Sequence, residues 1–175
     1  MSYEQFQSSI ENASLIAVAA HWNALRLNRL MPAWKDIDPA AIRQYLPIVW
    51  AWRYDPALET FIGRLAGEEI IAVLGVNTRG KRIDECFPAS AHELVLERYK
   101  TVISGPRLMH SCGKVFLHAG GRGNGERIVL PLADDGNHGD GVIGATVYKL
   151  GIRPTLLDKV SIDHTNEIID FFSLA

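Results

Sequence analysis

The sequence predicts an α+β fold built on a five-stranded antiparallel sheet, with helices inserted after the second strand and a helix at each end of the chain. The first observation is a hairpin pattern near the end: two β-branched, apolar runs, Ile128 to Ala133 and Val142 to Leu150, flank a polar, glycine-dense connection. The second is another pair of strand-like runs, Ile48 to Tyr54 and Thr60 to Ala66. The third is helical periodicity between the two pairs, which separates them into the two ends of one sheet.

Length and composition indicate one soluble globular domain. The chain has 175 residues, of which 47% are hydrophobic and 22% charged. The net charge of -2, without a basic cluster, argues against nucleic acid as a partner. No apolar run is long enough for a membrane span, and the start does not resemble a secretory signal, so we expect a cytoplasmic protein. Cys86 and Cys112 are expected to be reduced thiols.

The first 30 residues are expected to form a cap or dimer contact. Ser9 to Leu30 contains neither Pro nor Gly and predicts one long helix. Its apolar stripe, made by Leu15, Val18, Trp22 and Leu25, is wide enough for two neighbours. The helix therefore either covers the sheet and also joins a homodimer, or packs on its own domain alone.

The next elements follow from turn and strand signals. Asp38 is placed to cap a short helix that ends at Pro47. The strand from Ile48 to Tyr54 places Trp50 and Trp52 on one face, and the strand from Thr60 to Ala66 completes the hairpin.

Helical segments then precede the remaining strands. Short helices are predicted at Glu68 to Leu74 and Ile83 to Phe87, and the longest at Ala89 to Ser104. Arg107 to His118 predicts the third strand, and the glycine-rich stretch from Gly121 to Gly125 predicts a loop into the final hairpin. Residues 151–175 are read as a C-terminal extension with a connector and a helix near 165–172, whose apolar side must be buried.

Four motifs occur in this order along the chain: MPAWKDIDPAAI with YLP within 31–47, FIGRLAGEEI at 61–70, GVNTRGKRI at 75–83 and LPLADDG at 130–136. Together they resemble the small, stand-alone PAS-domain proteins common in alphaproteobacteria. The resemblance implies a PAS-like fold over residues 31–150 and a sensory or regulatory role. It also implies a pocket between the inner face of the sheet and the central helices, and signalling through contact with another protein.

We therefore expect a small apolar or aromatic ligand, or a cofactor of unknown identity, in this pocket. The small residues at Gly144 and Ala145 let another group approach the sheet, and Tyr and Thr hydroxyls would orient the ligand. The residues expected to bind it are Trp50, Trp52, Leu65, Leu96, Tyr99, Leu130, Gly144, Thr146 and Tyr148. The alternative is a ligand-free PAS adaptor or dimerisation protein, in which Trp50 and Trp52 are ordinary core residues.

Other chemistry is less well supported by the sequence. His110 and Cys112 lie two apart on a strand and so share a face that could reach a metal or a haem iron, but a core thiol beside an ordinary histidine is the favoured interpretation. Cys86 lacks the context of a flavin-reactive cysteine. No serine or cysteine lies in a recognisable nucleophile motif, so we expect neither a metal site nor an enzyme.

Overall fold

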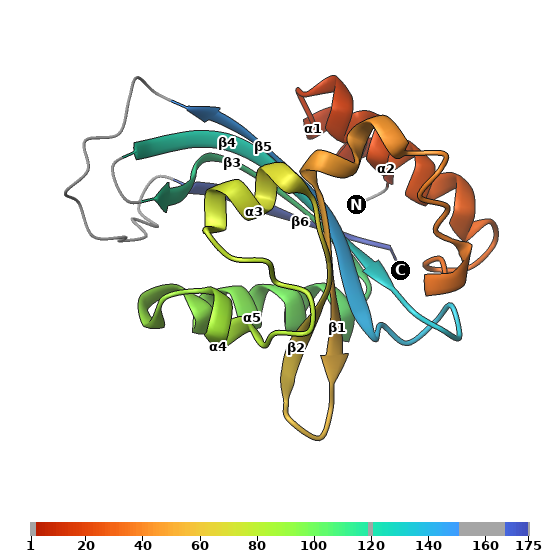
Figure 1. Ribbon diagram of the computed structural model, residues 1–175. Helices are drawn as coiled ribbons and strands as arrows, with labels where there is room; N and C mark the ends of the chain where they lie inside the picture. The colour runs from red at the N-terminus through yellow and green to blue at the C-terminus, as the bar shows by residue number, and fades with distance from the viewer. Residues whose placement is uncertain (1–2, 119–120, 151–166, 175) are drawn as a thin grey trace.

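The computed structural model describes residues 3–118, 121–150 and 167–174. Its centre is a six-stranded sheet in the order β2-β1-β5-β4-β3-β6, in which every neighbouring pair is antiparallel (Figure 1). The strands are β1 (Val49–Asp55), β2 (Thr60–Ala66), β3 (Arg107–His118), β4 (Gly121–Leu132), β5 (Gly141–Leu150) and β6 (Glu167–Ser173). The sequence predicted the α+β class and the antiparallel sheet correctly, but the sheet has a sixth strand.

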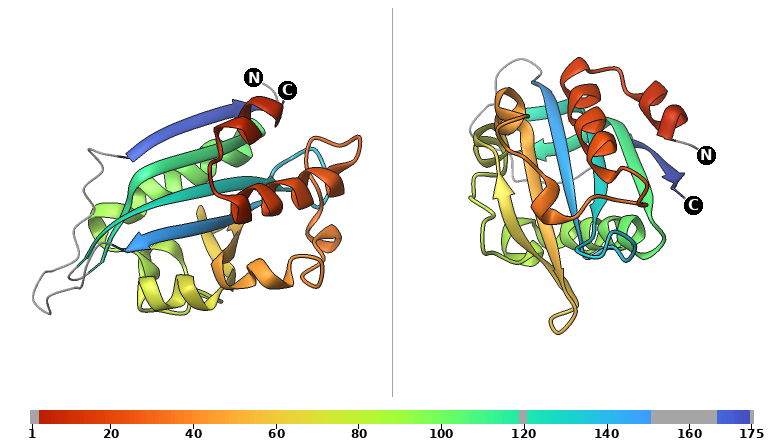
Figure 2. Two further views of the ribbon diagram at one scale, coloured as in Figure 1. Left: turned by 90° about the horizontal axis from the view of Figure 1, so that it is seen from above. Right: turned by 90° about the vertical axis from the view of Figure 1, so that its right-hand side faces the viewer.

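Helices cover both faces of this sheet (Figure 1, Figure 2). On one face lie the N-terminal helices α1 (Tyr3–Ser9) and α2 (Ala13–Arg26), whose apolar residues pack on side chains of all the strands except β2. On the other lie α3 (Glu68–Leu74), α4 (Ile83–Cys86) and α5 (Ala89–Ser104), which bury a separate apolar cluster. The sheet therefore forms the wall between two hydrophobic cores.

The N-terminal segment is two helices and not the single helix predicted from Ser9 to Leu30. A break at residues 10–12 separates α1 from α2, and the Asn12 side chain caps α2 by accepting from the Ser14 amide at 2.9 Å. The carboxylate of Glu126 on β4 accepts from the amides of Glu11 at 2.7 Å and Asn12 at 2.9 Å. These long-range hydrogen bonds offset the helical bonds that the break removes, and no local sequence pattern predicts them.

The segment before β1 also differs from the prediction. It contains two short 3-10 helices, η1 (Trp34–Asp36) and η2 (Arg43–Ile48), in place of a helix from Asp38 to Pro47. The Asp38 carboxylate accepts from the Ala40 amide at 2.9 Å, which makes a turn rather than a helix cap. Pro47 lies within η2, next to its last residue.

The chain from β2 to β3 agrees closely with the prediction, because strong local periodicity and Gly or Pro boundaries mark each element. The close approach of the α3–α4 connection to β2 explains Gly63. A Cβ at this position would overlap the carbonyl of Thr78, so only glycine lets the two backbones meet.

Two predictions near the C-terminus are wrong. The stretch from Gly121 to Gly125 is the start of β4 and not a loop, since its backbone pairs with β3 and β5. The described part of the segment predicted as a helix near 165–172 is strand β6, which pairs with β3 through Met109 and Phe171. Successive side chains of a strand point to opposite faces, so the apolar residues of β6 alternate between the two cores. Phe172 packs in the core with the N-terminal helices, and Phe171 packs in the core with α5.

Candidate functional site

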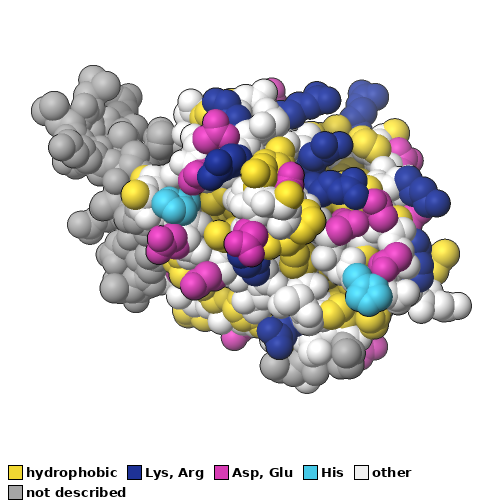
Figure 3. All heavy atoms as spheres, turned by 90° about the horizontal axis from the view of Figure 1, so that it is seen from below, with side chains coloured by type: hydrophobic (Ala, Val, Ile, Leu, Met, Phe, Trp, Pro, Cys, Tyr) yellow, Lys and Arg dark blue, Asp and Glu magenta, His cyan; other side chains and the backbone are white. Residues whose placement is uncertain are grey.

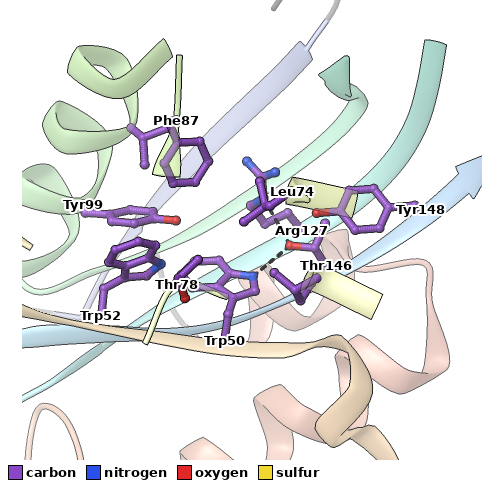
Figure 4. A pocket seen from close by; sticks show the side chains of 11 residues that line it. Trp50, Trp52, Leu74, Thr78, Phe87, Tyr99, Arg127, Thr146 and Tyr148 are labelled. Carbon is purple, nitrogen blue, oxygen red and sulfur yellow. Dashed lines mark hydrogen bonds between the residues drawn. The ribbon is translucent and has the colours of Figure 1, made fainter. Parts of the chain in front are cut away.

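The candidate site is a pocket between the sheet and α3–α5 (Figure 4). Strands β1, β4 and β5 form its floor, and the helical segment forms its opposite wall. The lining residues are Trp50, Trp52, Ile70, Leu74, Thr78, Phe87, Val95, Tyr99, Arg127, Thr146 and Tyr148.

Aromatic rings fill most of this space. The rings of Trp50 and Tyr99 stack with centroids 5.3 Å apart and an angle of 22° between their planes. The remaining cavity, measured as the space open to the centre of a water molecule, is about 30 Å³. That is room for one or two waters, whereas pockets for drug-sized molecules span roughly 300–1,000 Å³. In this conformation the cavity is too small for a drug-sized molecule.

Trp50 lies flat against the sheet because the neighbouring strand provides space for it. Its Cα pairs with that of Gly144 on β5, and a Cβ on Gly144 would overlap the indole ring. The indole Nε1 donates to Thr146 Oγ1 at 2.9 Å, which fixes the orientation of the ring. Gly144 therefore leaves the space that the Trp50 ring occupies against the sheet.

One end of the pocket is polar and positively charged. Arg127 Nε donates to Thr146 Oγ1 at 3.2 Å, and its guanidinium also hydrogen-bonds with Tyr148. Glu167 on β6 lies between Arg98 and Arg127, with nitrogen–oxygen distances of 2.7 Å and 3.9 Å, respectively. These contacts join the pocket to the edge strand β6.

The pKa shifts keep this end charged. Burial acts to lower the pKa of Arg127, but Tyr148 and Glu167 outweigh it, and the net pKa lies above its usual value. Burial raises the pKa of Tyr148, and it does the same for the buried Tyr99. At neutral pH, Arg127 is therefore a cation among neutral phenols.

Thr78 adds a hydroxyl to the same pocket. The residue is 1% exposed, and in the described part of the chain its Oγ1 has no hydrogen-bond partner. A buried hydroxyl without a partner costs free energy, so this group is a candidate to bond a molecule that enters the pocket.

Five of the nine predicted site residues line the pocket: Trp50, Trp52, Tyr99, Thr146 and Tyr148. Gly144 lies beneath the Trp50 ring. The structure therefore brings together six predicted residues from β1, β5 and α5.

The other three lie elsewhere. Leu130 faces the N-terminal helices, because it pairs with Ile143 while Val129 pairs with Gly144, one position along β4. Leu65 is 36% exposed and lies beside a bulge in the β1–β2 pairing. Leu96 packs against the same cluster as the pocket residues, but α5 presents Val95 and Tyr99 to the cavity.

Arg127 is the main residue that sequence reasoning missed. It alternates with Glu126 and Ile128 and therefore lies on the pocket face of β4. A charged residue directly before the apolar run that starts at Ile128 was the signal that could have identified it. Leu74 and Phe87 come from the short helical segments, whose orientation toward the sheet has no local signature.

His110 and Cys112 lie on the other face of the sheet from the pocket. His110 Nε2 is 2.9 Å from Glu126 Oε1, and both side chains are buried next to the N-terminal helices. Within the described ranges, no three His, Cys, Asp or Glu side chains are arranged to hold a metal ion.

The outer surface carries mixed charge. On the face shown in Figure 3, acidic and basic side chains lie among one another, as the net charge of -2 suggests. Among the described helices, none is both long enough and apolar enough to cross a membrane.

Comparison with known proteins gives the family. A family model described as PAS domain matches residues 10–147, which run from the linker before α2 into β5. Comparisons with curated proteins and with solved structures returned no match. With the match covering most of the chain and the antiparallel sheet holding the helical insert after β2, the chain belongs to the PAS domain family.

Proposed function

We propose that this PAS domain is a sensory module that binds a small molecule in the pocket of Trp50, Tyr99 and Arg127. Ligand binding would change the surface that the domain presents to a signalling protein. PAS domains as a family support a sensory or signalling role, and the pocket supports the ligand.

The observation that carries the proposal is a buried guanidinium in an aromatic cavity. The Arg127 side chain is 14% exposed and lies among the rings that line the pocket. Burying a charge costs free energy unless the charge is compensated, and apolar side chains at the same position would often give a core of equal or higher stability. Apolar walls with a few convergent polar groups are typical of ligand sites.

Entry of a ligand requires movement of the helical wall. The α3–α4 connection is held to β2 by two backbone hydrogen bonds, from Gly63 to the Lys81 carbonyl at 2.9 Å and from Gly80 to the Gly63 carbonyl at 2.8 Å. Leu74 at the end of α3 and Phe87 directly after α4 are only partly buried. Displacing these two side chains would enlarge the cavity without unpairing the strands of the sheet.

The test is a fragment screen by NMR on the full chain with its tryptophan indoles as reporters. Trp50 and Trp52 line the pocket, whereas Trp22 donates to the Pro131 carbonyl and Trp34 lies beside Asp140. A ligand in the pocket shifts the Trp50 and Trp52 signals and leaves those of Trp22 and Trp34 in place. A mixed library of neutral and charged aromatic fragments that moves neither pocket indole would contradict the proposal.

A ligand-free adaptor is the second candidate, and the small volume of the cavity favours it. Stacking of Trp50 on Tyr99 and a remaining volume of about 30 Å³ describe a nearly filled core. Native mass spectrometry of the gently purified protein separates the two candidates. A retained small molecule supports the sensor, and a bare chain together with a silent fragment screen supports the adaptor.

A further inference from the structure

We propose that the ligand of this pocket carries a carboxylate that Arg127 binds. The inference rests on the proposed function, because it names the chemical class of the molecule that the pocket takes. It requires a small organic anion with a planar or aromatic body.

The position of Arg127 supports this assignment. β4 lies between β3 and β5, so the backbone that carries Arg127 is fixed on both sides. Thr146 and Tyr148 on β5 then hold the guanidinium at one end of the cavity (Figure 4). A cation held in place before binding loses little conformational freedom when an anion arrives.

Electrostatics supports an anion over a neutral group. Glu167 forms ion pairs with both Arg98, at 2.7 Å, and Arg127, at 3.9 Å, so this one carboxylate is shared between two guanidinium groups. Attraction between opposite charges is stronger in a cavity walled by aromatic rings than in water. The planar guanidinium matches the two oxygens of a carboxylate, which gives short charge-assisted hydrogen bonds.

The side chains that line the cavity indicate the shape and polarity of the rest of the ligand. Trp50, Tyr99 and Phe87 present ring faces and edges to the cavity, and aromatic partners pack well in offset or edge-to-face arrangements. The Thr78 hydroxyl provides a further hydrogen-bonding group on the same wall. A short aromatic or planar carboxylic acid satisfies both ends of the pocket.

Benzoate and benzamide form a matched probe pair, since they share a ring and differ in the charge of the head group. We expect benzoate to shift the Trp50 and Trp52 indole signals of the full chain with at least tenfold higher affinity than benzamide. Arg127→Met should remove this preference, and Arg127→Lys, which keeps the charge, should retain part of it. Arg43→Met, at an exposed position on η2, is the control and should leave the preference unchanged.

If Arg127→Met does not fold, the wild-type preference and the Arg127→Lys variant still decide the question. Benzamide binding as tightly as benzoate would overturn the carboxylate assignment while leaving a ligand pocket in place. A preference for benzoate that Arg127→Met preserves would also overturn it. No shift with either probe would reject the assignment, and the broader fragment screen would then decide separately whether the pocket binds any ligand.

Discussion

Trp50 and Gly144 form the contact on which the pocket depends. The indole ring occupies the space where a side chain at Gly144 would lie, and Thr146 holds the indole nitrogen. Gly144 has no positive φ, so its role is space and not backbone freedom. The floor of the pocket is therefore set by one missing side chain.

We predict that Gly144→Ala destabilises the fold by about 1–3 kcal/mol, because the added methyl pushes Trp50 out of its place against rigid backbone. Urea unfolding measures the change in the free energy of unfolding. Gly105→Ala is the matched control, since the nearest atom to its new methyl would be Arg107 Nη2 at 3.7 Å, an ordinary contact. A Gly144→Ala variant as stable as the control would show that the Trp50 ring can move freely.

The thiol of Cys86 offers a test of burial in the helical segment. Burial raises its pKa from 9.0 to about 11, partly opposed by Lys81. The folded state thus favours the protonated thiol, and this stabilisation is complete below pH 9 and lost as the pH rises toward 11. We predict that iodoacetamide alkylation of Cys86 in a Cys112→Ser variant keeps accelerating above pH 9. In concentrated urea the same reaction should level off near pH 9, and an early plateau in the folded protein would be evidence of an exposed thiol.

At the scale of elements, the break between α1 and α2 is held by the sheet beneath it. Glu126 accepts from the Glu11 and Asn12 amides and contacts His110, so a single buried carboxylate connects the N-terminal segment to β3 and β4. The rings of Phe6 and Phe172 meet edge to face, with centroids 5.6 Å apart, and connect α1 to β6. The N-terminal helices are thus an integral layer of the fold.

We predict that Glu126→Gln costs about 1–3 kcal/mol of stability, because the amide keeps one oxygen and turns an NH₂ group toward one of the two backbone N–H donors. Hydrogen exchange at the Glu11 and Asn12 amides should accelerate. Glu97→Gln, at an exposed site on α5, should change neither stability nor exchange. Unchanged exchange at these two amides would show that other contacts hold the helix break.

At the scale of the whole molecule, the packing of α2 limits which of its sides a second subunit could contact. Leu15, Val18 and Trp22 are buried against the sheet, so this side of α2 is used within the domain. The outward side exposes Ala13, Ala20, Ala24 and Leu27. Any dimer through this helix must use that outward side.

We predict that the protein forms a homodimer through the outward side of α2. Two glutamates introduced together, Ala20→Glu and Ala24→Glu, should give a monomer, because like charges would face each other across the contact. Sedimentation equilibrium measures the mass, with Ala57→Glu in the exposed β1–β2 turn as the control. A monomeric wild type, or a dimer in the double variant, would exclude this contact.

Local sequence patterns were sufficient for the elements with strong periodicity. The bounds of β2, α3 and α5 follow from alternation, helical spacing and flanking Gly or Pro. The same patterns placed Trp50, Trp52, Tyr99, Thr146 and Tyr148 on the face that lines the pocket. Strand alternation and helical spacing were enough to assign these residues to one face of their element.

Long-range pairing decided the remainder. The segment from Ile168 to Phe172, which is apolar except for Asp170, suits a helix or a strand, and the open edge of β3 makes it a strand. Both faces of β4 are covered, so its apolar residues do not show which face holds the pocket. The register with β5 places Arg127 on the pocket face and Leu130 on the face that packs against the N-terminal helices. Chain composition and period thus specify the parts and their faces, while hydrogen bonds between distant strands determine which faces meet.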